Sequence, residues 1–416
     1  MDIIFNNARV KSKIRAISSK SEAHRALICA ALSDGNTRLV CTDTNADIDA
    51  TVSCLNSLGA DIKRTCDGFA IAPIKAVTKG AVLDCNESGS TLRFLLPLAS
   101  ALGADCSFLM RGRLSQRPLS PLYELLSENE ISLSPKGENP LRTDGMLPCG
   151  DYSVAANISS QYISGLLFAL SVAGGDSTLA LKGKIESAPY IDMTVNTLLS
   201  FGADIRFDSE NNIFYIKGKE KLTSPSRLTV GGDWSNAAFF LCAGVIGKDP
   251  VTLTGLDEGS AQGDRAILSV LRKMGADIRR EGGEITAFPS KLHGTLIDAA
   301  DIPDLVPVLA TVASVAEGET IIYNAARLRL KESDRIESVC AFLSSLGADI
   351  APTEDGMVIH GRASLVGGEV DSFNDHRIAM SAAIASLVCK NEVSISRFEA
   401  INKSYPSFLD GWDIEE

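Results

Sequence analysis

Basic residues recur along this chain beside serine and glycine, in patterns suited to binding anions. Lys20 and Ser21 precede Arg25, and Gly89 precedes Arg93. An arginine side chain makes paired hydrogen bonds with carboxylate and phosphate groups, and a lysine adds a compact positive charge. A single exposed cation usually marks only a solvated surface, but a recurring set predicts a site for polyanionic small molecules. The set comprises Lys20, Arg25, Arg93, Arg117, Arg327, Lys331, Arg335, Arg377 and Lys403.

Carboxylates and one histidine accompany these cations. Glu332 directly follows one of the lysines, His376 directly precedes one of the arginines, and Asp304 heads a separate predicted helix. A protein that only binds anions gains nothing from carboxylates in the same place, whereas such groups can carry protons during a reaction. We therefore expect Asp304, Glu332 and Lys20 to be catalytic, and His376 to share in proton transfer or to brace the site by hydrogen bonding.

An internal repeat indicates the elements that must hold these residues. The pentapeptide Leu58–Ile62 is nearly repeated at three later points, at intervals of about 72 residues or twice that. The doubled interval predicts a degenerate copy at Ser127–Ile131, and Phe408 with Leu409 begins a sixth. The three clear later copies are Phe201–Ile205, Met274–Ile278 and Leu346–Ile350.

Each repeat is predicted to be a βαβαββ unit. In the clearest one, Gly282 and Gly283 separate the two strands of a closing hairpin. Six such units predict stacked repeats that divide three and three. The elements of the clearest unit are the strand Leu228–Gly231, the helix Asp233–Gly247, the strand Val251–Gly255, the helix Asp264–Gly275 and the hairpin strands Ala276–Arg280 and Glu284–Phe288.

The predicted fold class is α/β, of the α+β kind, with two domains of three repeats each. The last repeat stops before its hairpin, while Ile3–Phe5 forms a strand ahead of the first repeat. We therefore expect the start of the chain to complete the last repeat. The first domain is predicted at residues 14–227, and the second at residues 1–13 and 228–416.

The first helix of every repeat is predicted to begin at an equivalent position. A serine or aspartate there accepts hydrogen bonds from the first free N–H groups of the helix, as an N-cap does. In a three-fold domain the same helix ends converge, and together with the helix dipole they favour a bound anion. The equivalent positions are Ser21, Ser88, Ser159, Ser235, Asp304 and Asp375.

The composition excludes several other classes of protein. With 416 residues, 45% of them hydrophobic, the chain is long enough for two globular domains. The net charge of −12 argues against nucleic acid or an anionic membrane as a partner. The 10 cysteines are scattered without a zinc-binding spacing, which is typical of a reduced cytoplasmic protein. No targeting segment or membrane span is visible, so we expect a cytoplasmic protein. We also expect it to be a monomer and to have no metal site.

Short motifs give the most specific signal. Two of them are Lys331–Arg335, which reads Lys-Glu-Ser-Asp-Arg, and Asn374–Arg377, which reads Asn-Asp-His-Arg. The others are Lys20–Arg25, Gly89–Arg93, Gln116–Pro118, Ser159–Gln161, Ser187–Tyr190, Ile302–Asp304 and Lys403–Pro406. In order and spacing, over the whole length, they resemble the EPSP synthase family, the 3-phosphoshikimate 1-carboxyvinyltransferases.

The resemblance implies two inside-out α/β domains of three repeats each, the enolpyruvyl transferase fold. It implies two substrates, shikimate 3-phosphate and phosphoenolpyruvate, and no cofactor. For shikimate 3-phosphate it implies contacts from Ser21, Arg25, Ser159, Ser160, Ser187 and Tyr190, with Asp304 and Lys331 at the ring hydroxyls. For phosphoenolpyruvate it implies contacts from Gly89, Arg117, Gln161, Arg335, Arg377 and Lys403, with Arg93 in the same segment as Gly89 and with Lys20 touching both substrates.

Three positions depart from the family's common pattern. Serine stands at Ser18 where the family often has glycine, after an isoleucine in place of proline. Glu87 adds a carboxylate just before the Gly89 segment, and Arg327 replaces an asparagine. Because Gly89 itself is retained, we expect the family's inhibitor glyphosate to compete with phosphoenolpyruvate.

Two rival functions fit the sequence less well. A related enzyme transfers the enolpyruvyl group to UDP-N-acetylglucosamine and depends on a loop cysteine, but Met110–Leu114 contains none. A non-catalytic repeat protein that binds phosphorylated metabolites would have no use for Glu332 and Asp304 among its cations.

Overall fold

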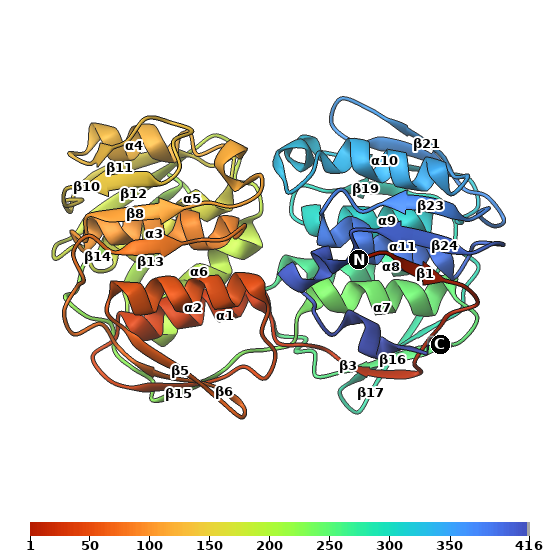
Figure 1. The fold of residues 1–416 in the computed structure, drawn as a ribbon, viewed down its shortest axis with the longest axis horizontal. Helices are drawn as coiled ribbons and strands as arrows, with labels where there is room; N and C mark the ends of the chain where they lie inside the picture. The colour runs from red at the N-terminus through yellow and green to blue at the C-terminus, as the bar shows by residue number, and fades with distance from the viewer. Residues whose placement is uncertain (414–416) are drawn as a thin grey trace. The chain divides into compact units, whose positions relative to one another are not determined.

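The computed structural model describes residues 1–413, which form two compact domains (Figure 1). The first domain is Ser18–Val230, and the second is Met1–Ile17 together with the chain from Gly231 onward. Each domain has its own hydrophobic core. The sequence predicted boundaries at 13 and 227, and the structure places them four and three residues later.

The first domain contains three sheets of one pattern. In each, two parallel strands are followed by an antiparallel hairpin, as in β11, β12, β14 and β13. This is the predicted βαβαββ arrangement. In spatial order the sheets are β15 (Arg227–Thr229), β4 (Thr37–Val40), β6 (Gly68–Ala72) and β5 (Asp61–Thr65); β7 (Val82–Asp84), β8 (Cys106–Leu109), β10 (Leu141–Asp144) and β9 (Ser132–Leu133); and β11 (Asp151–Ala155), β12 (Ser177–Lys182), β14 (Ile213–Lys217) and β13 (Asp204–Asp208).

The first helix of each repeat lies inside this domain. Along α1, for example, every residue from Ala23 to Ala31 is buried, which requires neighbours on all sides of the helix. These inner helices are α1 (Lys20–Ala31), α3 (Gly89–Ala101) and α5 (Ser160–Leu170). The second helices are α2 (Ala46–Leu58), α4 (Leu122–Glu128) and α6 (Ala188–Ser200), with the 3-10 helix Leu114–Gln116 before α4.

The second domain repeats the pattern, and the start of the chain belongs to it. Strand β1 (Ile3–Phe5) pairs antiparallel with β24 (Val393–Ser396), with Ile3 opposite Ile395, so the start of the chain adds a strand to the sheet of the last repeat. The sheets are β17 (Asp277–Glu281), β18 (Glu284–Phe288), β16 (Val251–Thr254) and β3 (Lys13–Arg15); β19 (Leu296–Asp298), β20 (Glu319–Tyr323), β22 (Met357–His360) and β21 (Asp349–Pro352); β1 (Ile3–Phe5), β24 (Val393–Ser396) and β23 (Gly368–Asp371); and the pair β2 (Arg9–Val10) and β25 (Trp412–Asp413).

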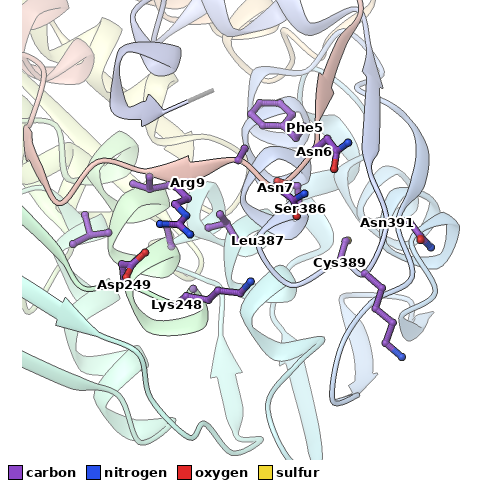
Figure 2. A pocket seen from close by; sticks show the side chains of 16 residues that line it. Phe5, Asn6, Asn7, Arg9, Lys248, Asp249, Ser386, Leu387, Cys389 and Asn391 are labelled. Carbon is purple, nitrogen blue, oxygen red and sulfur yellow. The ribbon is translucent and has the colours of Figure 1, made fainter. Parts of the chain in front are cut away.

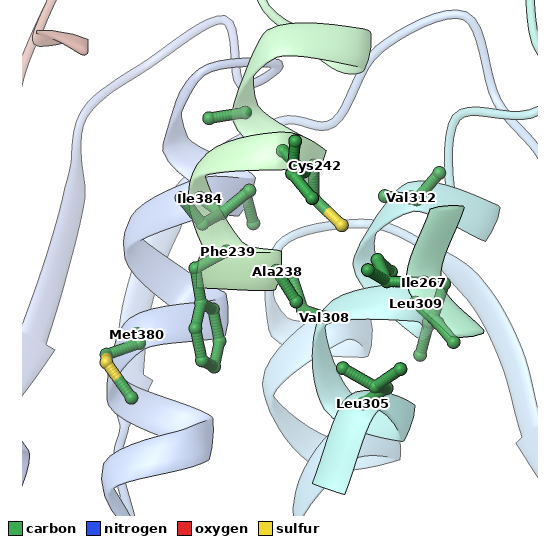
Figure 3. Close-up of a cluster of buried hydrophobic side chains, with 14 of the residues drawn as sticks. Ala238, Phe239, Cys242, Ile267, Leu305, Val308, Leu309, Val312, Met380 and Ile384 are labelled. Carbon is green, nitrogen blue, oxygen red and sulfur yellow. The ribbon is translucent and has the colours of Figure 1, made fainter. Parts of the chain in front are cut away.

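Three inner helices also fill the core of the second domain. Phe239 and Cys242 project from one of them toward Leu309 and Met380 of the other two (Figure 3). The inner helices are α7 (Trp234–Ile246), α9 (Val306–Ala313) and α11 (His376–Ser386), and the second helices are α8 (Ile267–Lys273) and α10 (Arg335–Ser345). The 3-10 helices are Gly263–Ala266, Pro303–Leu305, Ala326–Leu330, Phe398–Lys403 and Phe408–Gly411.

One predicted strand joins a different sheet from the one expected. The sequence placed Leu228–Gly231 at the head of the fourth repeat, beside the strand that begins at Val251. Instead β15 lies parallel to β4 in the first domain, with Leu228 opposite Leu39. Strand β3 takes the expected place beside β16, with Ile14 opposite Leu253. The prediction was wrong because both crossing segments carry short strands, and the local pattern does not specify the sheet that each one joins.

Two predicted helix starts are displaced by two residues. Ser88, Ser159 and Asp375 cap α3, α5 and α11 as predicted. The cap of α1 is Ser19 instead of Ser21, and the cap of α7 is Asp233 instead of Ser235. Both alternatives are good capping residue types, so the sequence alone did not choose between them. Asp304 lies within the 3-10 helix Pro303–Leu305.

Candidate active site

Lys20 and Arg25 lie on the first turns of α1 and are held by neighbouring elements of the first domain. Lys20 Nζ lies 3.0 Å from a carboxylate oxygen of Asp47, at the start of α2. Arg25 donates to the carbonyl oxygens of Ser21 and Tyr190 over 2.7 and 2.9 Å. Burial of Arg25 lowers its pKa to about 10, so the guanidinium is still charged at neutral pH. It is thus a desolvated cation, which an anion would stabilise strongly.

A second cationic group of the first domain surrounds Gly89. Arg93 donates to Gln161 Oε1 over 2.6 Å, and Gln161 donates to Ser90 Oγ over 2.9 Å. A Cβ atom added to Gly89 would lie 2.9 Å from Nη1 of Arg117 and 3.0 Å from Nη1 of Arg93. Glycine therefore lets two guanidinium groups approach the first turn of α3 closely.

The predicted serines of the first domain lie at helix starts. Ser159 caps α5 and accepts from the backbone N–H of Gln161, and Ser160 is the first residue of that helix. Ser187 precedes α6 in a left-handed conformation, with φ of 54°, and Tyr190 follows in the first turn. Free N–H groups at such helix starts favour phosphate.

Arg335 organises the predicted residues of the second domain. Its side chain is 1% exposed, yet it contacts three carboxylates. It donates to Asp304 over 2.7 Å, to Glu332 over 2.8 Å and to Asp375 over 2.8 and 3.2 Å. Asp304 and Glu332, the two carboxylates predicted to be catalytic, are therefore brought together around one buried guanidinium.

Asp304 is ionised in this arrangement. Burial alone would raise its pKa, but Lys331, Arg377 and Arg335 lower the pKa well below its ordinary value. Lys331 Nζ lies 3.3 Å from Asp304 Oδ1, and Nη2 of Arg377 lies 3.8 Å from Oδ2. Burial lowers the pKa of Lys331, while Asp304 opposes that effect.

The other predicted residues of the second domain contact residues that neighbour this cluster in the chain. Arg327 donates to the carbonyl oxygen of Ala300 over 2.6 Å, in the loop that leads to the 3-10 helix containing Asp304. Lys403 donates to the carbonyl oxygen of Asn374 over 2.7 Å. His376 is 3% exposed, and its Nδ1 lies 3.8 Å from Asp375 Oδ1.

Two functional residues escaped the sequence analysis. Asp47 holds Lys20, but it looked like an ordinary acidic residue in the first turn of a helix. Asp375 was identified only as a helix cap, yet it is fully buried and also accepts from Ser333 over 3.0 Å. The sequence signal for Asp375 was its place between Asn374 and His376 in a recognised motif. The sequence around Asp47 gave no such signal.

The second domain has a further cavity at the C-terminal ends of two of its inner helices, α7 and α11 (Figure 2). It measures about 190 Å³ and is lined by the residues that follow α7 and α11, including Lys248 and Lys390, and by Arg9. None of the predicted site residues lines it. Cations near helix C-termini are explained by the helix dipole, so this cavity adds nothing to the site.

Two further searches concern only residues 1–413. Among them, no three histidine, cysteine or acidic side chains are grouped as a metal site would require. No helix in that part of the chain is long and apolar enough to span a membrane.

Comparisons with known proteins agree on one family. The EPSP synthase (3-phosphoshikimate 1-carboxyvinyltransferase) family profile matches residues 4–412. A 3-phosphoshikimate 1-carboxyvinyltransferase of Clostridium perfringens strain SM101 is 42% identical over 412 residues, which cover 98% of this chain and 96% of the relative. One from Clostridioides difficile strain 630 is 41% identical and covers 97% and 94%.

A solved structure has the same fold over its whole length. The EPSP synthase of Acinetobacter baumannii superposes with a TM-score of 0.80 at 27% identity, covering 100% of this chain and 99% of that one. The chain therefore belongs to the EPSP synthase (3-phosphoshikimate 1-carboxyvinyltransferase) family.

Proposed function

We propose that this protein transfers the enolpyruvyl group of phosphoenolpyruvate to the 5-hydroxyl of shikimate 3-phosphate. The products are 5-enolpyruvylshikimate 3-phosphate and inorganic phosphate. The observation that carries the proposal is the cluster of Asp304, Glu332, Lys331 and Arg335, with hydrogen bonds of 2.7 and 2.8 Å from Arg335 to the two carboxylates. Family membership agrees with this reaction.

Residues of both domains bind the substrates in this proposal. Shikimate 3-phosphate is bound by Arg25 and by the serines at the starts of α1, α5 and α6. Its ring lies against Tyr190, and its hydroxyls meet Asp304 and Lys331. Phosphoenolpyruvate is bound by Gly89, Arg93, Arg117, Gln161, Arg335, Arg377 and Lys403, and Lys20 contacts both substrates.

The reaction proceeds by addition and then elimination. A proton is added to the methylene carbon of phosphoenolpyruvate, which leaves a cationic carbon stabilised by its oxygen. The 5-hydroxyl attacks that carbon and loses its proton, giving a tetrahedral intermediate. Removal of a proton from the new methyl group then expels phosphate. These steps need two proton carriers and a set of cations for the phosphate and carboxylate charges.

Glu332 exchanges the carbon-bound proton and Asp304 accepts the hydroxyl proton. A carboxylate with a lowered pKa is a weak base, but an alcohol bonded to a cationic carbon is strongly acidic, so a weak base suffices. Lys20 lies near the bridging oxygen, and His376 braces the cluster beside Asp375.

A phosphate-release assay separates this function from its rivals. Phosphoenolpyruvate with shikimate 3-phosphate is expected to release phosphate, whereas phosphoenolpyruvate with UDP-N-acetylglucosamine is not. Release only with the second acceptor would support the related transferase. No release with either acceptor, with binding of both shikimate pathway substrates confirmed by calorimetry, would support a non-catalytic binder.

We also propose that the protein acts as a cytoplasmic monomer. The support is its acidic composition and its scattered thiols, of which eight are buried or partly buried. Sedimentation at several protein concentrations tests the oligomeric state.

A further inference from the structure

A chain of hydrogen bonds connects three helices inside the first domain. His24 Nδ1 on α1 lies 2.7 Å from Thr51 Oγ1 on α2, which lies 2.7 Å from Thr91 Oγ1 on α3. Thr91 Oγ1 donates to Ser88 Oγ over 2.7 Å. None of the four residues is more than 1% exposed, so water does not compete for these bonds.

The direction of this chain follows from counting hydrogens. A hydroxyl has only one hydrogen, and Thr91 uses its hydrogen toward Ser88. Thr91 must therefore accept from Thr51, and Thr51 must in turn accept from His24. The ring of His24 then carries its proton on Nδ1.

His24 is held in this one state by its surroundings. Burial lowers its pKa well below the ordinary value, and the charges of Lys20 and Arg25 lower it further. Of the two acidic groups at the start of the neighbouring α2, Asp47 is paired with Lys20 and Asp49 accepts from Thr44. Within residues 1–413, Nε2 of His24 is buried without a hydrogen-bond partner, so a second proton there would be an unsatisfied donor.

The two ends of the chain lie at predicted substrate contacts. His24 follows Lys20 by one turn of α1, and Ser88 caps α3 immediately before Gly89. We infer that His24 is a positioning residue which, through Thr51 and Thr91, fixes the first turn of α3 relative to Lys20. The assignment of this turn to phosphoenolpyruvate rests on the proposed function.

Steady-state kinetics of isosteric variants test the inference. Thr51→Val keeps the shape of the side chain but breaks the chain of hydrogen bonds. We expect the KM for phosphoenolpyruvate to rise about 5- to 50-fold, the loss typical of a broken buried hydrogen bond, with little change for shikimate 3-phosphate. His24→Asn retains an N–H donor at the δ position and should preserve the KM, whereas His24→Leu should not.

Thr311→Val is the matched control. Thr311 is also fully buried on an inner helix, but within residues 1–413 its hydroxyl donates to the carbonyl oxygen of Pro307 alone. The Thr311→Val variant should lose thermal stability without a change in the KM for phosphoenolpyruvate or for shikimate 3-phosphate. An unchanged KM for phosphoenolpyruvate in Thr51→Val, or equal behaviour of the Asn and Leu variants of His24, would overturn the inference.

Nitrogen NMR of histidine-labelled protein gives a test that does not depend on activity. The chain has only 4 histidines, and His24→Asn assigns the signal. The expected result is a neutral ring protonated at Nδ1 throughout the range from mildly acidic to neutral pH. A proton on Nε2, or a charged ring at neutral pH, contradicts the inference. A wild-type protein that releases no phosphate would overturn the proposed function, while this NMR result would still decide the state of His24.

Discussion

At the scale of single residues, the contacts of Arg335 explain how several carboxylates are held in fixed positions among cations. Its guanidinium gives Asp304, Glu332 and Asp375 definite directions, and its own exposure of 1% keeps water from weakening these bonds. Removing one partner of a buried ion pair typically costs about 3–5 kcal/mol because the other charge is left uncompensated. Conservative substitutions are therefore the informative ones here.

Glu332→Gln is expected to reduce turnover about 10²- to 10⁴-fold, the range typical of a general acid or base. The amide oxygen can still accept from Arg335, so folding and binding of shikimate 3-phosphate should be preserved. Glu337→Gln is the control, because Glu337 forms an exposed ion pair with Arg329. Turnover of Glu332→Gln within threefold of wild type would reduce Glu332 to a structural partner.

Gly89→Ala is expected to weaken both phosphoenolpyruvate binding and glyphosate inhibition. The added methyl group would lie 2.9 Å from Arg117 and 3.0 Å from Arg93 and must displace both guanidinium groups. A tenfold rise in KM and in the inhibition constant corresponds to about 1.4 kcal/mol. Gly35→Ala, where the methyl group meets only Ser224 at 3.5 Å, should change neither constant. Unchanged inhibition in Gly89→Ala would contradict this account of the loop.

The sequence predicted the types of the site residues better than their partners. Motifs identified Lys20 and Arg335, because lysine and arginine in those patterns are specific to anion sites. They did not identify Asp47 as the partner of Lys20, since that contact joins residues 27 positions apart. Ion pairs between elements depend on packing that no local pattern specifies.

At the scale of elements, the ends of the second helices show what the repeated pentapeptide does. Gly59, Gly202, Gly275 and Gly347 all have positive φ, between 71° and 114°, and lie one or two residues after the ends of their helices. The next residue donates back to the helix, as Ala276 does to Leu271 over 2.9 Å. In the degenerate copy Ile131 makes this bond to Leu126, and Glu130 takes the glycine position with φ of 66°. The interval was predicted correctly, but the sequence aligned this copy, Ser127–Ile131, two residues too early.

Glu130→Gly should therefore stabilise the protein by about 0.5–1 kcal/mol, because glycine adopts this conformation without a steric penalty. Gly275→Ala should destabilise the protein by about 1–2 kcal/mol, since alanine is strained at φ of 98° and its methyl group would approach His293. Denaturant unfolding measures both. A destabilised Glu130→Gly would show that the side chain contributes more than the strain costs.

The sheets that two short strands join, where the chain passes from one domain to the other, could not be predicted from the sequence. From chain order, β3 would join the sheet of β4 and β15 the sheet of β16. Instead, β3 pairs with β16 and β15 pairs with β4. Choosing between the two sheets requires long-range pairing, which a hydrophobic pattern does not encode.

At the scale of the whole molecule, the proposed substrate contacts belong to two domains that each have a separate core. If shikimate 3-phosphate contacts both sets, it should protect backbone amides in both. We expect slower hydrogen exchange at the starts of α1, α5 and α6 and also around Asp304 and Lys331. Protection confined to Ser18–Val230, with binding confirmed by calorimetry, would exclude the second domain from the site of this substrate.

The central claim is that the protein performs addition and elimination on phosphoenolpyruvate, and the reaction in D₂O tests it most directly. Deuterium added to the methylene carbon makes a CH₂D group, and loss of one hydrogen from it leaves deuterium in most product molecules. Mass spectrometry of the product is therefore expected to show deuterium in its vinyl group. A product formed at the normal rate without deuterium would contradict the mechanism.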